Sequence, residues 1–128
     1  MSLVLFSAFS CSYAQKGSLS PKEFSKAMDA ATDAQLLDVR TPEEFEEGHI
    51  ENALNIDWNG DSFDEEISKL DKTQPVFIYC RSGNRSNDAA AHMQKAGFKN
   101  IYKLKGGMIA WERERILKAP GKDKDEEE

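Results

Sequence analysis

The chain has 128 residues, of which 39% are hydrophobic and 31% are charged, and its formal net charge at pH 7 is -6. This length suits one domain built around one hydrophobic core, and the composition is typical of a soluble globular protein rather than a disordered or fibrous one. A net acidic chain without a basic stripe argues against nucleic acid as its main partner.

Cysteine and histidine are too few and too scattered for a disulfide framework or a zinc site. The two cysteines are Cys11 and Cys80, and only Cys80 lies in the part of the chain that reads as a folded domain. The two histidines, His49 and His92, lie far apart and lack the clustered partners of a zinc site. We therefore expect no metal ion and no other cofactor.

Residues 1–17 have the features of a targeting leader. An apolar run from Val4 to Phe9 precedes small residues that end at Ala14, after which a signal peptidase would cut, although the basic start of such a signal is missing. The run is shorter than the roughly 20 apolar residues that span a bilayer. We expect a periplasmic or secreted protein, or a cytoplasmic one if the leader is not a signal. Lipid attachment to Cys11 is a weaker alternative, because Phe9 fits that signal poorly.

Helix-like and strand-like segments alternate over residues 18–117, which predicts an α/β domain with a largely parallel sheet. Ser20 and Thr41 are each followed by proline and, three positions on, by glutamate, a capping pattern that starts helices at Pro21 and Pro42. The other predicted elements are strands over 36–39, 53–56, 75–79 and 100–104 and helices over 61–70, 86–96 and 108–117. The charged residues 118–128 are expected to form a disordered tail.

The clearest strand, Pro75 to Tyr79, is a continuous apolar run, as expected when helices cover both faces of a sheet. Cys80 follows it directly, at a strand end where open parallel sheets bind their ligands. The next residues contain Gly83 and two arginines, Arg81 and Arg85, and a helix comes after them. Backbone N–H groups, the positive end of a helix and the guanidinium charges all favour a thiolate, which is the nucleophilic form of cysteine.

A lone cysteine after an apolar strand is more often a small buried hydrophobic residue. Two arginines and a glycine in a strand-to-helix turn favour the reactive interpretation instead, because an inert buried site would not attract such charge.

Several segments in the same order resemble the rhodanese family of sulfurtransferases. These are Leu36 to Phe45, Gly48-His49-Ile50, Cys80 to Arg85, Gly97 to Tyr102 and Gly106 to Trp111. The resemblance implies a rhodanese-like three-layer fold, in which a central five-stranded parallel sheet carries helices on both faces. It also implies a single-domain thiosulfate sulfurtransferase, whose cysteine takes a sulfane sulfur, becomes a persulfide and passes that sulfur to an acceptor.

Loop length argues against the nearest rival chemistry, that of the cysteine phosphatases. Their loop has five residues between cysteine and arginine and cradles a phosphate, whereas four residues separate Cys80 from Arg85. A tighter ring suits one transferred sulfur atom, and phosphatase activity is therefore not expected.

Roles follow for the residues of this loop and for those near it. Cys80 is the predicted nucleophile, and the N–H groups of the loop Arg81-Ser82-Gly83-Asn84-Arg85 are expected to stabilise its sulfur. The side chains of Arg81 and Arg85 are expected to bind an anionic donor. Three supporting residues complete the predicted site. Ser86 is expected to cap the helix, and the resemblance implies that Asp38 and Arg40, which end a neighbouring strand, brace the loop by ion pairing.

Two functions from different classes remain open at this point. In the first, a small anionic donor such as thiosulfate loads Cys80, and a thiol, cyanide or a protein sulfur acceptor removes the sulfur. In the second, the domain is a sulfur carrier, a redox module or a partner-docking module without turnover. In either case we expect a monomer that does not bind nucleic acid and does not span a membrane.

Overall fold

The computed structural model describes residues 17–118 of the chain, and side chains for residues 17–115. The predicted targeting leader and charged tail therefore lie outside the described residues, apart from Gly17 and Lys118. None of the helices within 17–118 is long and apolar enough to cross a membrane.

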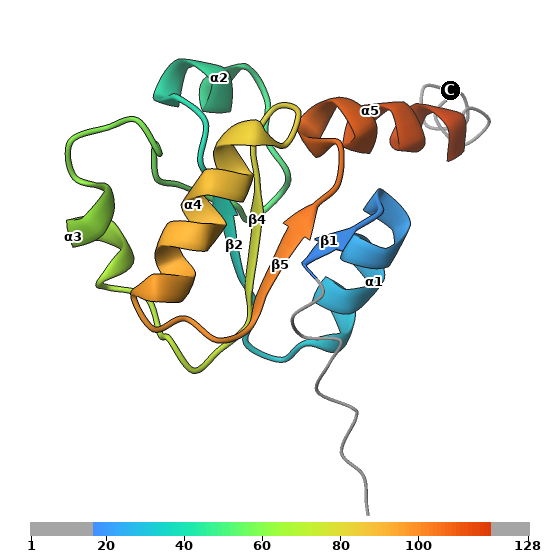
Figure 1. Ribbon diagram of the computed structural model, residues 1–128. Coiled ribbons are helices and arrows are strands. Elements are labelled where there is room, and N and C mark those ends of the chain that lie inside the picture. The colour runs from blue at the N-terminus through green and yellow to red at the C-terminus, as the bar shows by residue number, and fades with distance from the viewer. Residues whose placement is uncertain (1–16, 119–128) are drawn as a thin grey trace, which may run out of the picture.

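Five parallel strands form a single sheet, in the order β1-β5-β4-β2-β3 (Figure 1). Their bounds are β1 Ser18–Leu19, β2 Gln35–Asp38, β3 Leu54–Asn55, β4 Val76–Tyr79 and β5 Ile101–Leu104. The predicted α/β class and five-stranded parallel sheet are confirmed. Sequence patterning missed β1, because a two-residue edge strand is too short to show an apolar period.

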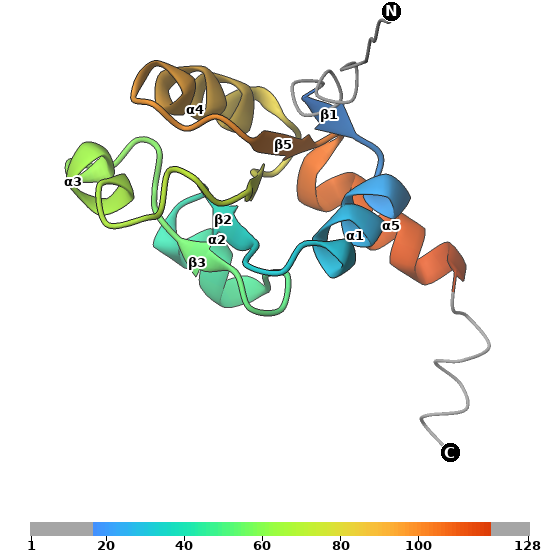
Figure 2. The ribbon, with the colours of Figure 1, turned by 90° about the horizontal axis from the view of Figure 1, so that it is seen from below.

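Helices cover both faces of the sheet, as Figures 1 and 2 show. Their bounds are α1 Pro21–Ala30, α2 Pro42–Glu47, α3 Phe63–Ile67, α4 Asn84–Lys95 and α5 Gly107–Lys118. The capping boxes predicted at Ser20 and Thr41 are both formed, and they start α1 and α2. Helices α1 and α5 lie on one face of the sheet, and α3 and α4 lie on the other.

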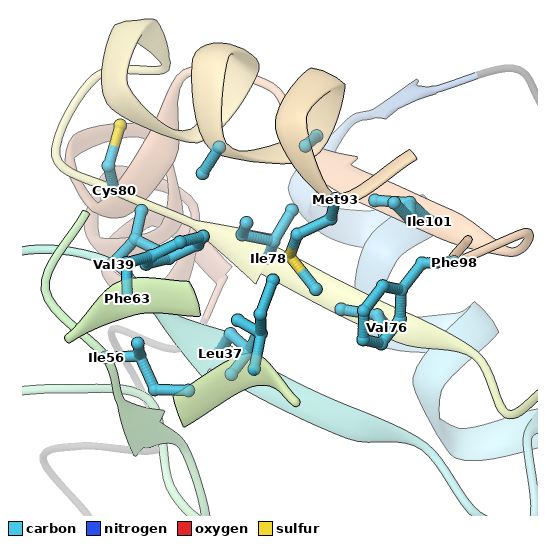
Figure 3. Close-up of a cluster of buried hydrophobic side chains, with 13 residues drawn as sticks. Leu37, Val39, Ile56, Phe63, Val76, Ile78, Cys80, Met93, Phe98 and Ile101 are labelled. Carbon is cyan, nitrogen blue, oxygen red and sulfur yellow. The ribbon is translucent and has the colours of Figure 1, made fainter. Parts of the chain in front are cut away.

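The two faces of the sheet divide the core into two clusters because strand side chains alternate in direction. In β4, Val76 and Ile78 point toward α3 and α4, whereas Phe77 and Tyr79 point toward α1 and α5. Cys80 continues the first series and belongs to the α3–α4 cluster. Figure 3 shows its sulfur pointing away from the other labelled side chains, toward the loop that leads into α4.

The strand register sets the place of the site. Asp38 at the end of β2 pairs with Tyr79 at the end of β4, and the two strands are parallel neighbours. Arg40 and Cys80 therefore follow adjacent strands at the same edge of the sheet. Helices α2 and α4 start at this edge, and so does α5, which follows β5 on the other side of β4 (Figure 1).

Phe24 of α1 is a sensitive test of the α1–α5 layer. It is fully buried, and its ring packs edge-on against Phe77, with 5.3 Å between ring centroids. We expect Phe24→Ala to lower the free energy of unfolding in urea by about 3–5 kcal/mol, because it leaves a cavity in the core. Leu54→Ala, in the edge strand β3, is the control; Leu54 is 50% exposed, and a loss below about 1 kcal/mol is expected. Equal losses would contradict this packing.

Candidate active site

The sulfur of Cys80 lies inside a turn of backbone N–H groups at the end of β4. The residue is 1% exposed. Its Sγ accepts hydrogen bonds from the N–H of Gly83 at 3.1 Å and the N–H of Ser86 at 3.3 Å. Both donors belong to the start of α4, so the positive end of that helix also faces the sulfur. This arrangement stabilises negative charge on the sulfur.

The prediction that Ser86 caps α4 is wrong. The helix begins at Asn84, and its N-cap is Gly83, with φ of 124° and no side-chain cap. Ser86 is instead buried in the first turn, where its hydroxyl donates to the carbonyl of Gly83 at 3.2 Å and lies 3.4 Å from the sulfur. A cap acceptor normally meets the N–H at this position of the first turn. Here the sulfur of Cys80 accepts that hydrogen bond.

Other loop N–H groups remain unused. The main-chain N–H groups of Arg81, Ser82, Asn84 and Arg85 donate no hydrogen bond to the residues that the structure describes. The predicted cradle over residues 81–85 thus holds the resting sulfur through Gly83 alone, with Ser86 just beyond that range as the second donor.

Arg85 is held by α2. Its guanidinium makes two hydrogen bonds to the carboxylate of Glu44, of 2.9 and 3.1 Å. The same carboxylate accepts the N–H of Thr41 as part of the helix cap. These contacts fix the far end of the cysteine loop. The guanidinium of Arg85, which we expected to bind an anionic donor, is thus already paired with Glu44. The sequence predicted the capping role of Glu44 but not this ion pair.

Asp38 and Arg40 form a buried ion pair, with 2.8 Å between Arg40 Nη2 and Asp38 Oδ2. The same Nη2 donates to the carbonyl of Gly48 at 2.7 Å. No hydrogen bond joins either side chain to residues 80–85 in the described structure. The pair therefore braces the segment after α2, and the ion pair that reaches the loop is the one between Glu44 and Arg85.

The start of α5 holds the other side of the loop. The N–H of Met108 donates to the carbonyl of Cys80 at 2.9 Å, and the N–H of Ile109 donates to the carbonyl of Arg81 at 3.2 Å. Gly107, with φ of 60°, allows this approach, because a Cβ there would come within 2.6 Å of the Cys80 carbonyl oxygen and closer still to that of Arg81. With their carbonyls held by α5, Cys80 and Arg81 are fixed at the start of the turn.

A groove of about 290 Å³ borders the loop at Arg81. Arg81 is exposed and has no hydrogen bond or ion pair to the described residues through its side chain.

No three His, Cys, Asp or Glu side chains within the described part of the chain are grouped closely enough to hold a metal ion.

Gly107→Ala tests the contact between α5 and the loop. Its φ of 60° lies in a region that alanine tolerates at moderate cost, so the added methyl group acts mainly by colliding with the loop carbonyls. We expect a loss of about 2 kcal/mol or more in the free energy of unfolding beyond that of Gly97→Ala. Gly97 is the control, because its φ of 106° is less favourable for alanine than that of Gly107, yet only the flexible side chain of Lys72 is near. Equal losses would contradict a close approach at Gly107.

The ion pair between Glu44 and Arg85 predicts a pH dependence of stability. Hydrogen bonds from Arg85 are the main reason that the pKa of Glu44 falls from 4.5 to about 2. Because the folded state has the lower pKa, the stabilisation is complete above about pH 4.5 and is lost as the pH falls toward 2.

In urea unfolding at a series of pH values, the stability advantage of the wild type over Glu44→Gln should therefore shrink across that window. Glu43→Gln, an exposed change in the same helix, should show no such narrowing. A constant advantage of the wild type over Glu44→Gln down to about pH 2 would count against the ion pair.

Comparison with known proteins agrees with this architecture. The family model of the Rhodanese-like domain matches residues 20–114. The Sulfurtransferase of Allochromatium vinosum is 36% identical over 92 residues, which are 72% of this chain and 84% of that protein. The Thiosulfate sulfurtransferase GlpE of Coxiella burnetii is 39% identical over 79 residues, which are 62% of this chain and 72% of that protein.

Among solved structures, that of a rhodanese-related protein from Thermoplasma volcanium aligns with a TM-score of 0.67 and 28% identity, over 77% of this chain and 92% of that one. Other curated relatives are longer, and the chain spans 25% of one and 30% of another. With a family match over most of its length and the predicted sheet in place, the chain belongs to the rhodanese-like domain family.

Proposed function

We propose that the protein is a sulfurtransferase that carries sulfane sulfur as a persulfide on Cys80, with thiosulfate or a similar compound as donor and a thiol or cyanide as acceptor. The observation that carries the proposal is that the buried sulfur of Cys80 accepts hydrogen bonds from two backbone N–H groups at the start of α4. Two relatives named as sulfurtransferases, one of them as a thiosulfate sulfurtransferase, support it.

In the first step, the thiolate of Cys80 attacks the sulfane sulfur of thiosulfate. A new S–S bond forms on Sγ, the S–S bond of thiosulfate breaks, and sulfite leaves with the electron pair of that bond. No proton moves, because both the attacking and the leaving group are anions. The attacking sulfur accepts hydrogen bonds from the N–H groups of Gly83 and Ser86, and such donors favour negative charge on it.

The persulfide places a second, negatively charged sulfur about 2 Å beyond Sγ, close to the length of any S–S bond. In this proposal the loop offers the outer sulfur the four N–H groups that have no acceptor within residues 17–118, those of Arg81, Ser82, Asn84 and Arg85. Hydrogen bonds of N–H groups to an anion are stronger than those to a neutral sulfur. They would hold the charged intermediate much as an oxyanion hole holds oxygen.

In the second step, a thiolate or cyanide attacks the outer sulfur and takes it, and the electron pair of the S–S bond returns to Cys80. The sulfur of Cys80 is then the leaving group. The same N–H groups that favour its negative charge make it a better leaving group. One set of donors thus serves both half-reactions.

Arg81 and Arg85 contribute differently to donor binding in this proposal. The charge of Arg85 is largely offset by Glu44, so its main part is to fix the loop. Arg81 is exposed at the groove, which makes it the loop arginine best placed to attract an anionic donor.

Incubation with thiosulfate should add the mass of one sulfur atom to the intact protein, and cyanide should remove it. Cys80→Ser should abolish the adduct because it lacks the nucleophile, although it retains Cys11. Cys11→Ser is the matched control and should load as the wild type does. Mass spectrometry of the intact, folded protein measures all of these, and an unchanged wild-type mass would refute the proposal.

Steady-state turnover distinguishes this enzyme from the alternative of a carrier or docking module. With thiosulfate and cyanide both in excess, thiocyanate should form over many cycles at a constant rate. A single stoichiometric equivalent of thiocyanate per protein would instead identify a carrier that needs its own partner for reloading.

A further inference from the structure

The groove beside the loop has walls from three elements. Arg81 comes from the cysteine loop, Glu47 comes from the last turn of α2, and Met108, Ile109 and Glu112 come from the first turns of α5. Its volume of about 290 Å³ suits a small molecule. Figure 1 shows α2 and the start of α5 on either side of the point where α4 begins.

The charges of the groove are only partly balanced by one another. Two of its charged residues, Arg40 and Glu44, are used in the ion pairs with Asp38 and Arg85. The other three, namely Arg81, Glu47 and Glu112, are exposed and form no ion pair with any residue from 17 to 115. The groove therefore presents one positive and two negative groups, next to the loop that holds the reactive sulfur.

This set of charges does not suit a purely anionic compound. A dianion such as thiosulfate is attracted by Arg81 but repelled by Glu47 and Glu112. An amino-acid thiol, in contrast, offers a carboxylate to Arg81 and an ammonium to the two glutamates. Between these charged walls, Met108 and Ile109 offer apolar surface for its methylene groups; Ile109 is 39% exposed.

We propose that the groove selects the sulfur acceptor, and that the acceptor is a small thiol with both an ammonium and a carboxylate group. Glu47, Glu112 and Arg81 are its specificity-determining residues. This inference rests on the persulfide proposed above. The acceptor thiolate attacks the outer sulfur, a new S–S bond forms on the acceptor, the bond to Cys80 breaks, and the electron pair returns to Cys80 as thiolate. The product is the persulfide of the amino-acid thiol.

The two glutamates must then act in opposite directions on the two half-reactions. Their charge attracts the ammonium of the acceptor and repels the anionic donor. Removing that charge should slow discharge to an ammonium thiol and speed loading from thiosulfate. A general loss of structure would slow both, so the opposite signs distinguish selection from damage.

The test starts from protein that has been loaded with thiosulfate, freed of excess donor and checked by mass. Discharge is then timed with four thiols at equal thiolate concentration: cysteine, cysteamine, 2-mercaptoethanol and 3-mercaptopropionate. Because an exposed ion pair is worth up to about fivefold, we expect cysteine and cysteamine to react about 3–10 times faster than 2-mercaptoethanol. We expect 3-mercaptopropionate to be slower than cysteine.

In the double variant Glu47→Gln with Glu112→Gln, cysteine and cysteamine should discharge the protein less than about twofold faster than 2-mercaptoethanol does. The rate of loading from thiosulfate should rise about 2–5-fold. Arg81→Gln should lower the rate with cysteine toward that with cysteamine, because of these two ammonium thiols only cysteine has a carboxylate. Glu46→Gln is the control; it removes a charge from the same helix, but Glu46 does not line the groove.

Equal discharge rates for the four thiols, in protein that loads normally, would overturn the inference and favour a protein-borne thiol as acceptor. A double variant that changed loading and discharge in the same direction would overturn it as well. Failure of the wild type to load at all is a different result, because it removes the persulfide and refutes the proposed function itself.

Discussion

The sulfur of Cys80 occupies the place of the N-terminal cap of α4, and the rest of the site depends on this contact. A helix needs an acceptor for its first N–H groups, which is usually a side-chain oxygen of the cap residue. The cap residue here is Gly83, which has no side chain, and the sulfur accepts from Gly83 and Ser86 instead. Negative charge on the sulfur and the start of the helix therefore stabilise each other.

This contact requires the loop to keep its shape, so that the N–H groups of Gly83 and Ser86 stay directed at the sulfur. Two attachments provide this, and each comes from a different strand end. Glu44, which follows β2, holds Arg85, and the N–H groups of Met108 and Ile109, which follow β5, hold the carbonyls at the start of the loop. A parallel sheet makes this possible, because it brings the carboxyl ends of distant segments to one edge. The loop is thus clamped from both neighbouring strands.

Local signals in the sequence were sufficient for most of the fold. The capping boxes at Ser20 and Thr41 and the apolar run of β4 each depend on adjacent residues, and each is present. Contacts between distant segments were not predictable in the same way. Arg85 and Glu44 are 41 positions apart, and nothing local indicates that they pair. The role of Ser86 was missed for a related reason, since a serine near a helix start suggests a cap unless the competing acceptor is known.

The pairing of the arginines leaves little net positive charge around Cys80. Two of the arginines near Cys80 are matched by carboxylates, Arg40 by Asp38 and Arg85 by Glu44, so they add little net charge to the site. Apart from the charge of Arg81, the groups that can still stabilise negative charge on the sulfur are the N–H dipoles at the start of α4. These act over about 3 Å inside a buried turn, where salt screens them far less than it screens exposed charges. Of these arginines, Arg85 thus fixes the loop through Glu44, and the hydrogen bonds to the sulfur itself come from the backbone N–H groups of Gly83 and Ser86.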